Sequence, residues 1–213
     1  MRVAPEGRRV IGLAVIGGGV MAALGVAIGH AWLIVPAVAG AGFCCWFFRD
    51  PEREPPSDPR LVVSPADGRV LAVTPVEEND LLGCPTTRVS IFMSVFDVHV
   101  NRSPIGGVIE KIRYTPGKFY AAFADKSSDE NERNAMILND DGRRYLVVQI
   151  AGAVARRIVN RYSEGDTMTR GERYGMIMFG SRVDVYLPTD HVVRVRPKMR
   201  VRAGTSVIAE VPA

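Results

Sequence analysis

Histidine and cysteine are scarce in this sequence of 213 residues, which contains three of each. Cys44 and Cys45 are adjacent in an apolar run and Cys84 stands alone, a spacing that fits neither a disulfide framework nor a zinc site. The chain also lacks a phosphate-binding loop, a dinucleotide fingerprint and a metal-binding triad. The sequence therefore predicts no metal and no ordinary bound cofactor, and its cysteines indicate a reducing compartment.

Charge is modest overall and unevenly placed. The net charge of +4 suits a surface that meets anionic lipid, and no basic cluster interleaved with aromatic residues predicts nucleic-acid binding. Between Val10 and Phe48 the ionisable side chain of note is His30. This charge-poor stretch separates the N-terminal part of the chain from the rest.

Two apolar runs, Val10–Ile28 and Ala31–Phe48, fill that stretch. Each is close to the length that crosses a hydrocarbon core of about 30 Å, and Gly29-His30 leaves room for a tight turn. A signal peptide or a buried core hairpin would be alternative interpretations. We favour a transmembrane helical hairpin, because the second run follows at once and lipid-embedded helices tolerate glycines and Pro36.

Basic residues flank the apolar runs on both sides. Arg2, Arg8 and Arg9 precede the first run, Arg49 and Arg53 follow the second, and the turn between them has no Lys or Arg. The positive-inside rule then places both ends of the hairpin in the cytoplasm. We therefore expect a protein of the cell (inner) membrane whose remaining part lies on the cytoplasmic face.

The chain is predicted to have three parts. Residues 1–48 form the membrane-anchoring hairpin, and residues 49–59 form a linker rich in proline and charge. Residues 60–213 form a domain of many short β-runs broken by Gly, Pro, Asp and Asn, which predicts a mainly β barrel or sandwich. Phe119–Ala124 is expected to make a helical turn or two, and Asp125–Glu130 a mobile loop.

The β-runs are bounded by turn residues, and Asp141-Gly142 between two of them predicts a hairpin turn. They are Leu61–Val63, Arg69–Thr74, Val89–Val95, Val108–Tyr114, Met136–Asn139, Tyr145–Ile150, Val154–Val159, Val192–Val195 and Ser206–Val211.

A Gly-Ser joint between two further strands is the stretch with the most chemical potential. The strands are Met176–Phe179 and Arg182–Leu187, and Gly180-Ser181 connects them. Glycine allows backbone conformations that strain other residues, and a serine hydroxyl directly after it can approach the preceding carbonyl carbon. Most Gly-Ser pairs are simple turns, so the joint alone indicates little.

Five other motifs accompany the joint, and together in this order and spacing they resemble the short form of the phosphatidylserine decarboxylase family from about Pro51 to the C-terminus. They are Ser64–Gly68, Phe96–Pro104, Pro116–Phe119, Asn131–Asn134 and Arg170–Glu172.

The resemblance implies a self-cleaving enzyme. Ser181 attacks the carbonyl of Gly180, and elimination splits the chain into a large chain 1–180 and a small chain 181–213 that remain a heterodimer. The new N-terminus carries a pyruvoyl group, whose ketone forms a Schiff base with the substrate amine and accepts electrons as carbon dioxide leaves. The expected reaction converts phosphatidylserine of the bilayer to phosphatidylethanolamine, and a higher oligomeric state is left open.

The serine needs a base, and three histidines are available. His30 lies in the predicted membrane turn and His191 in a loop or strand edge. The resemblance assigns the base to His99 and the carboxylate that orients it to Asp67. Without the resemblance, Asp67 before a glycine would be a turn residue.

The sequence departs from the family pattern at two positions. Longer bacterial members carry a second histidine where this chain has Arg102, so either His99 serves both processing and decarboxylation or Arg102 alters the geometry. Arg182 stands where the family motif has threonine after the serine. Asp97 is a further candidate for orienting His99.

Two alternative functions stay open at this point. One is a non-catalytic, membrane-tethered carrier or adaptor domain, in which Lys198 of Pro197–Met199 would be the carrier lysine. The other is a decarboxylase of a different serine phospholipid, such as an archaeal ether lipid.

Overall fold

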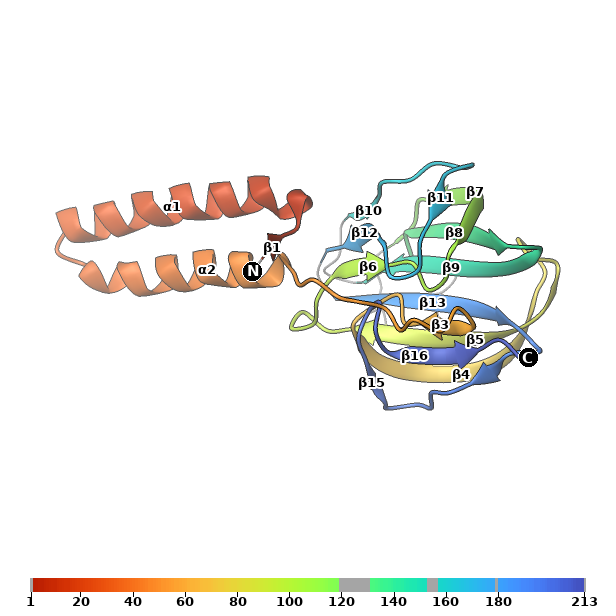
Figure 1. The fold of residues 1–213 in the computed structure, drawn as a ribbon. Coiled ribbons are helices and arrows are strands. Elements are labelled where there is room, and N and C mark those ends of the chain that lie inside the picture. Colours follow the sequence, from red (N-terminus) through yellow and green to blue (C-terminus); the bar gives the residue numbers. More distant parts are fainter. Residues whose placement is uncertain (1, 119–130, 153–156, 179, 213) are drawn as a thin grey trace. The chain divides into compact units, whose positions relative to one another are not determined.

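The computed structural model describes residues 2–118, 131–152, 157–178 and 180–212, and Figure 1 shows the fold. The chain divides into two compact units, Met1–Glu52 and Arg53–Ala213. The first is helical and the second is built from β-strands. The division falls inside the segment for which the sequence predicts a linker.

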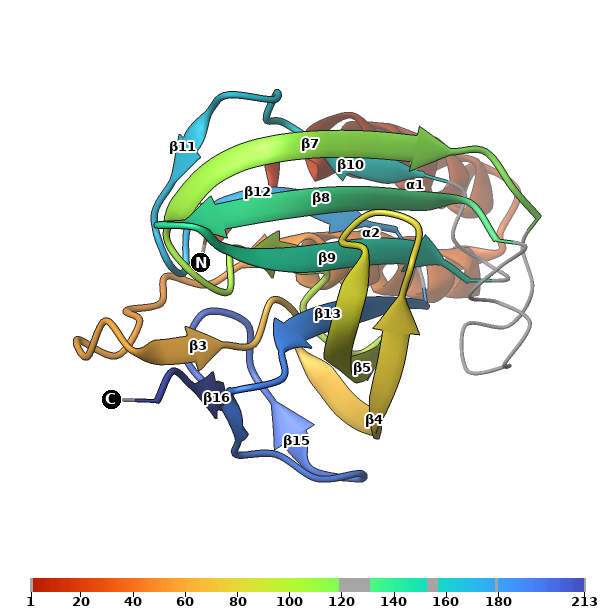
Figure 2. The same ribbon diagram turned by 90° about the vertical axis from the view of Figure 1, so that its right-hand side faces the viewer.

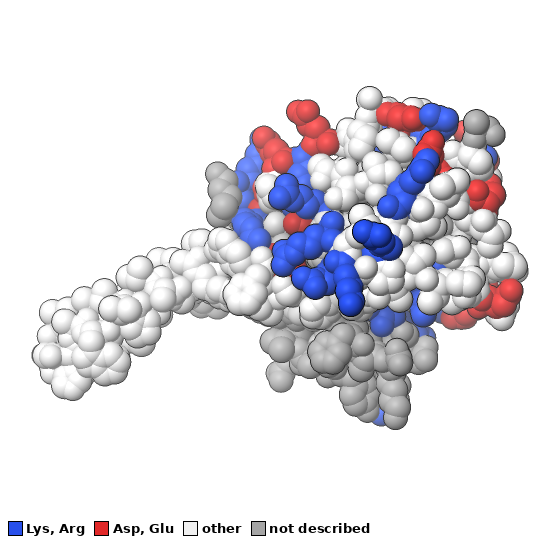
Figure 3. Space-filling view, turned by 90° about the horizontal axis from the view of Figure 1, so that it is seen from below, with Lys and Arg blue, Asp and Glu red and all other residues white. Residues whose placement is uncertain are grey.

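The helical unit is a hairpin of two apolar helices, each entered through a 3-10 turn. One helical segment, Pro5–Ala27, is long and apolar enough to cross a membrane, with a mean hydropathy of 2.2, and the apolar helix Ala31–Phe47 is shorter. The helices are white over most of their visible length in Figure 3, without charged side chains. The elements are η1 (Pro5–Gly7), α1 (Arg8–Ala27), η2 (Ala31–Leu33) and α2 (Ile34–Phe47).

A short strand pair closes the open end of this hairpin. Strand β1 (Arg2–Val3) pairs antiparallel with β2 (Arg49–Asp50). The Arg49 guanidinium lies 3.8 Å from the centre of the Trp46 ring, a cation–π contact. Within the helical unit, the basic residues of both flanks, Arg2, Arg8 and Arg9 on one side and Arg49 on the other, therefore lie at one end of the hairpin. Arg53, the remaining flanking residue, belongs to the β unit.

In its described residues the β unit contains one eight-stranded sheet and two three-stranded sheets, with their strands paired antiparallel. The large sheet has the strand order β11-β7-β8-β9-β13-β5-β4-β15 and curls into a half-barrel (Figure 2). The small sheets have the orders β10-β12-β6 and β14-β16-β3. The bounds are β3 (Leu61–Val63), β4 (Gly68–Glu78), β5 (Cys84–Met93), β6 (Val100–Arg102), β7 (Gly107–Thr115), β8 (Arg133–Asp140), β9 (Arg143–Ala151), β10 (Ile158–Asn160), β11 (Thr167–Met168), β12 (Arg173–Ile177), β13 (Ser181–Pro188), β14 (Val192–Val193), β15 (Arg200–Val201) and β16 (Val207–Glu210).

The alternation of side chains along β13 decides what enters the main core. Val183, Val185 and Leu187 are fully buried in the largest apolar cluster, as the alternating pattern predicts. Tyr186 points to the opposite face, where it packs on a second, smaller cluster. Because β13 lies between β9 and β5, its first residue, Ser181, begins a strand that is paired on both sides.

The turn between β8 and β9 is the hairpin that the sequence predicts. Asp141 and Gly142 both have positive φ, +47° and +87°, the signature of a type I′ turn, and Asp140 pairs with Arg143. The Asn139 side chain accepts a hydrogen bond from the Gly142 N–H at 2.9 Å. Local sequence therefore sets the register of these two strands.

The predicted fold class is confirmed: a mainly β domain that follows two N-terminal helices, one of which is apolar enough to span a membrane. Of the strand predicted over Val154–Val159, Ile158 and Val159 lie in β10, Arg157 precedes it, and residues 154–156 lie outside the described residues. The predictions for Phe119–Ala124 and Asp125–Glu130 lie outside the described residues.

Candidate active site

The Gly180–Ser181 peptide lies at the start of the central strand β13. Gly180 has a φ of +60°, a left-handed conformation that glycine adopts without the strain other residues incur. Ser181 is fully buried and pairs with Met93 of β5 and with Ala151 of β9. The strand thus fixes the serine from both sides, while the glycine lets the chain turn into it.

His99 reaches this peptide from the loop before β6. Its ring is fully buried, and the Gly180 N–H points to its Nε2 at 3.4 Å, a long and weak hydrogen bond. Its Nδ1 lies 3.0 Å from the Asp97 carbonyl oxygen. Because Nε2 accepts from an amide, Nδ1 carries the proton and donates it to Asp97. The nitrogen able to take up a proton therefore faces the Gly-Ser junction.

Asp97 contacts the His99 ring through its backbone carbonyl. The Asp97 carboxylate accepts hydrogen bonds from the backbone N–H and the hydroxyl of Ser94, at 2.9 and 2.8 Å. The side chain closes the turn that carries the histidine. The contact between the Asp97 carbonyl and His99 Nδ1 supports the prediction that Asp97 orients His99.

The Ser181 hydroxyl ends a chain of buried polar contacts that sequence reasoning missed. It donates to the Met93 sulfur at 3.4 Å, and Asn101 Nδ2 donates to the same sulfur at 3.6 Å. Gln149 in turn donates to Asn101 Oδ1 at 2.8 Å, and Asn134 to Gln149 Oε1 at 3.1 Å. All five side chains are buried. The one sequence signal for this network is the lone Gln149 in an otherwise apolar run.

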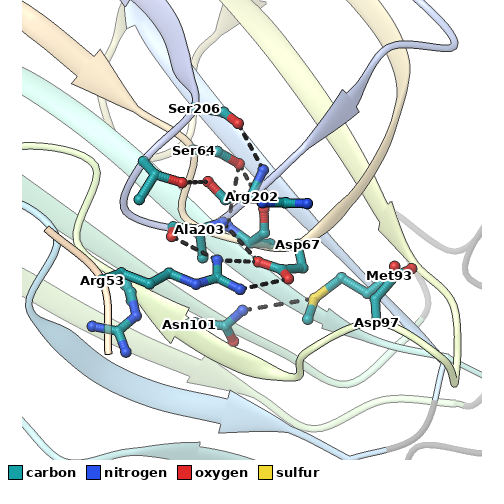
Figure 4. Close-up of polar contacts among 12 residues, drawn as sticks. Arg53, Ser64, Asp67, Met93, Asp97, Asn101, Arg202, Ala203 and Ser206 are labelled. Atoms are coloured by element: carbon teal, nitrogen blue, oxygen red, sulfur yellow. Dashed lines mark hydrogen bonds and ion pairs between the residues drawn. The ribbon is translucent and has the colours of Figure 1, made fainter. Parts of the chain in front are cut away.

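Asp67 makes a different set of contacts from those expected of a base-orienting residue. Its carboxylate is held by both terminal nitrogens of Arg53, with Nη2 to Oδ2 at 2.7 Å, and by the Ala203 N–H at 2.8 Å (Figure 4). Its turn is nevertheless joined to the strand after His99, because the Arg102 N–H donates to the Pro65 carbonyl at 2.9 Å. The role of Asp67 toward His99 stays a prediction.

The two departures from the family pattern occupy different places. Arg102 donates to the Gly171 carbonyl at 3.1 Å, and whether it shapes the base stays a prediction. Arg182 is buried and forms a two-pronged ion pair with Asp184, at 2.8 and 2.6 Å. Because adjacent residues of a strand point to opposite faces, Arg182 faces away from the side of the sheet that Ser181 occupies.

His191, the other histidine of the β unit, is tied to a tyrosine. Its Nε2 lies 2.7 Å from the Tyr145 hydroxyl, and its Nδ1 lies 2.7 Å from Asp190. Burial raises the pKa of Tyr145 to about 12, so the phenol stays protonated and donates to the histidine. His191 thus serves to hold the β13–β14 turn on β9.

Comparisons with known proteins agree with one another. A profile of the family described as phosphatidylserine decarboxylase matches residues 41–209. The phosphatidylserine decarboxylase proenzyme of Nitratidesulfovibrio vulgaris is 49% identical over 209 residues, 97% of this chain and 94% of the relative. The proenzymes of Symbiobacterium thermophilum and Granulibacter bethesdensis are 51% and 47% identical, over 85% and 92% of this chain and 85% and 81% of their own lengths.

These relatives, together with the β domain and its buried Gly-Ser junction, show the class of protein: it is an enzyme, a decarboxylase. The chain belongs to the phosphatidylserine decarboxylase family. The predicted family and enzyme class are thereby confirmed. The carrier interpretation, in which Lys198 would be the carrier lysine, loses its support.

Proposed function

We propose that the protein is a self-cleaving, pyruvoyl-dependent phosphatidylserine decarboxylase of the cell inner membrane, with its β domain on the cytoplasmic face. The observation that carries the proposal is the Gly180–Ser181 junction with His99 Nε2 beside it, in a chain of this family. Ser181, His99 and Asp67 are the proposed catalytic residues.

The first step is an attack of the protein on its own backbone. His99 Nε2 takes the proton of the Ser181 hydroxyl, Oγ attacks the Gly180 carbonyl carbon, and the Ser181 nitrogen leaves as an amine, so that an ester replaces the amide. Nε2 must exchange the Gly180 N–H for the serine hydroxyl. The contact it gives up is long, at 3.4 Å, so little stabilisation is lost in that exchange.

The second step breaks the chain. Loss of the Ser181 α-proton and cleavage of its Cβ–Oγ bond leave Gly180 as a carboxylate and residue 181 as a dehydroalanine. Water then replaces its nitrogen, which departs as ammonia, and the small chain begins with a pyruvoyl group. No external oxidant or reductant is needed, because every electron pair stays within these bonds.

The residues around Ser181 fit such a group. Met93 and Ala151 surround the position with an apolar lining and a weakly accepting sulfur. When formed, the pyruvoyl group supplies a ketone for the substrate amine and an acceptor for the electron pair freed with carbon dioxide. His99 would then be placed to return a proton to the decarboxylated carbon.

The helical unit supports a membrane location for this chemistry. Its basic ends lie together, as the positive-inside rule requires for two ends on one side of a bilayer. Figure 3 shows Lys and Arg gathered on one face of the β domain, which favours anionic headgroups. The phospholipid substrate is therefore met at the interface.

Intact mass analysis tests the proposal. Purified full-length protein should run as two chains on a denaturing gel, with the small one lighter by one ammonia than a peptide 181–213 that begins with serine. Vesicles containing phosphatidylserine should release carbon dioxide and yield phosphatidylethanolamine. A single full-length band in active protein would contradict self-cleavage, and turnover of a different serine phospholipid alone would redirect the substrate assignment.

A further inference from the structure

We propose that Arg53, the first residue of the β unit, is a positioning residue for self-cleavage that acts through Asp67; this inference rests on the proposed function. Arg53 lies in the segment that the sequence predicts to be a linker. The structure gives its guanidinium a buried site instead, with its side chain 10% exposed. A charged group is rarely buried to this extent without a specific partner.

The partner of Arg53 is Asp67, and Ala203 contacts both of them (Figure 4). Arg53 Nη2 donates to Asp67 Oδ2 at 2.7 Å, and Nη1 contacts both Oδ1 and the Ala203 carbonyl, the latter at 2.7 Å. The Ala203 N–H donates to Asp67 Oδ1 at 2.8 Å, so the three residues form a ring. A fork of two parallel N–H groups fixes the plane of a carboxylate as well as its position.

This ring leaves Asp67 capacity for another donor. An ionised carboxylate has about four lone-pair sites, and three donors are accounted for here. The Asp67 turn is hydrogen-bonded to the strand after His99 through Pro65 and Arg102. Arg53 therefore fixes the orientation of the one proposed catalytic carboxylate, in a turn bonded to the strand that directly follows the proposed base.

The same segment offers a matched control. Arg170 binds the segment through the carbonyl oxygens of Pro56 and Asp58, and binds the Leu61 carbonyl at the start of β3. Among the described residues its hydrogen bonds go to these carbonyl groups and not to Asp67. Lysine in place of either arginine keeps the charge and removes the fork. R53K and R170K therefore both loosen the segment, but only R53K frees the carboxylate.

The rate of splitting is measured by pulse labelling during cell-free synthesis of the full-length chain. We expect R53K to split about ten- to a hundred-fold more slowly than wild type, the scale on which small misplacement of a catalytic group acts. R170K should split close to the wild-type rate. Thermal unfolding is compared in an uncleavable S181A background, where R53K should lose no more stability than R170K.

A double-mutant cycle separates positioning from folding. If Arg53 acts through Asp67, R53K combined with D67N should be no slower than D67N alone. The inference would be overturned if the two substitutions slowed splitting additively, or if R53K or D67N split at the wild-type rate. It would also be overturned if both lysine variants slowed splitting in proportion to their loss of stability. Failure of wild type to split would instead overturn the proposed function, so the two failures are distinguishable.

Discussion

The two units of the protein depart from the usual placement of side chains in opposite ways: the helical unit exposes large apolar side chains, and the β unit buries polar ones. In the helical unit large apolar side chains are exposed, with Leu13 72% and Val35 70% accessible. In the β unit polar side chains are completely buried, among them Ser181, His99 and Gln149. Each unit thus contradicts the usual distribution in its own direction.

The difference shows what each unit is for. A large exposed apolar surface is the feature that the proposed membrane location explains. Buried polar groups stabilise a fold only when they are hydrogen-bonded, and a connected set of them around a Gly-Ser junction indicates chemistry. Location and catalysis are therefore expected to separate when the units are altered one at a time.

The largest expected effect tests the buried polar side of the comparison. Ser181→Ala removes the attacking hydroxyl and should abolish splitting, leaving one full-length band on a denaturing gel. Ser90→Ala is the control, because Ser90 is also buried but lies on β5 opposite Asp184. Splitting of the Ser181→Ala protein would place the cleavage point elsewhere.

The next effect concerns the base. His99→Ala should slow splitting by about 10²- to 10⁴-fold, the usual contribution of general base catalysis. His191→Ala removes a histidine that is bonded to Tyr145 instead, and should split at the wild-type rate even if its melting temperature falls. Pulse labelling gives both rates. Wild-type splitting in His99→Ala would exclude it as the processing base.

Deleting residues 1–48 tests the apolar side. The shortened protein keeps Arg53 and should fold and split, because the division between the units falls after Glu52. It should lose most activity on phosphatidylserine in vesicles and little on a short-chain, soluble phosphatidylserine. Equal loss on both substrates would mean that the helices belong to the catalytic structure.

The smallest effect concerns the sulfur next to Ser181. Met93→Leu keeps the volume but removes the acceptor that holds the Ser181 hydroxyl before the reaction. Because that hydroxyl must leave the sulfur to give its proton to His99, splitting should become faster by a factor of about two to five, the scale of one modest hydrogen bond. Met136→Leu makes the same change in the same apolar core and should leave the rate unchanged. Equal rates in the two variants would show that the sulfur contact has no role.

Local pattern in the sequence determined much of this protein. The two helices can be predicted because a long apolar run is a local property of the sequence, which no contact with distant residues is needed to recognise. Asp141-Gly142 predicts its turn because few residues accept positive φ at two successive positions. Alternation along β13 predicts which face is buried, and the motif resemblance directs attention to Ser181.

Tertiary structure alone decided the contacts that complete the site. Ser181 and Met93 are 88 residues apart, and Arg53 and Ala203 are 150 apart, distances over which periodicity carries no information. Arg53 reads as a linker residue because proline and charge surround it in sequence, yet folding provides Asp67 as a buried counter-charge. Pairing of strands that are distant in the chain is what brings these groups together. The sequence, through the resemblance, could therefore name Ser181 and His99, but not the Met93, Asn101 and Gln149 side chains around them.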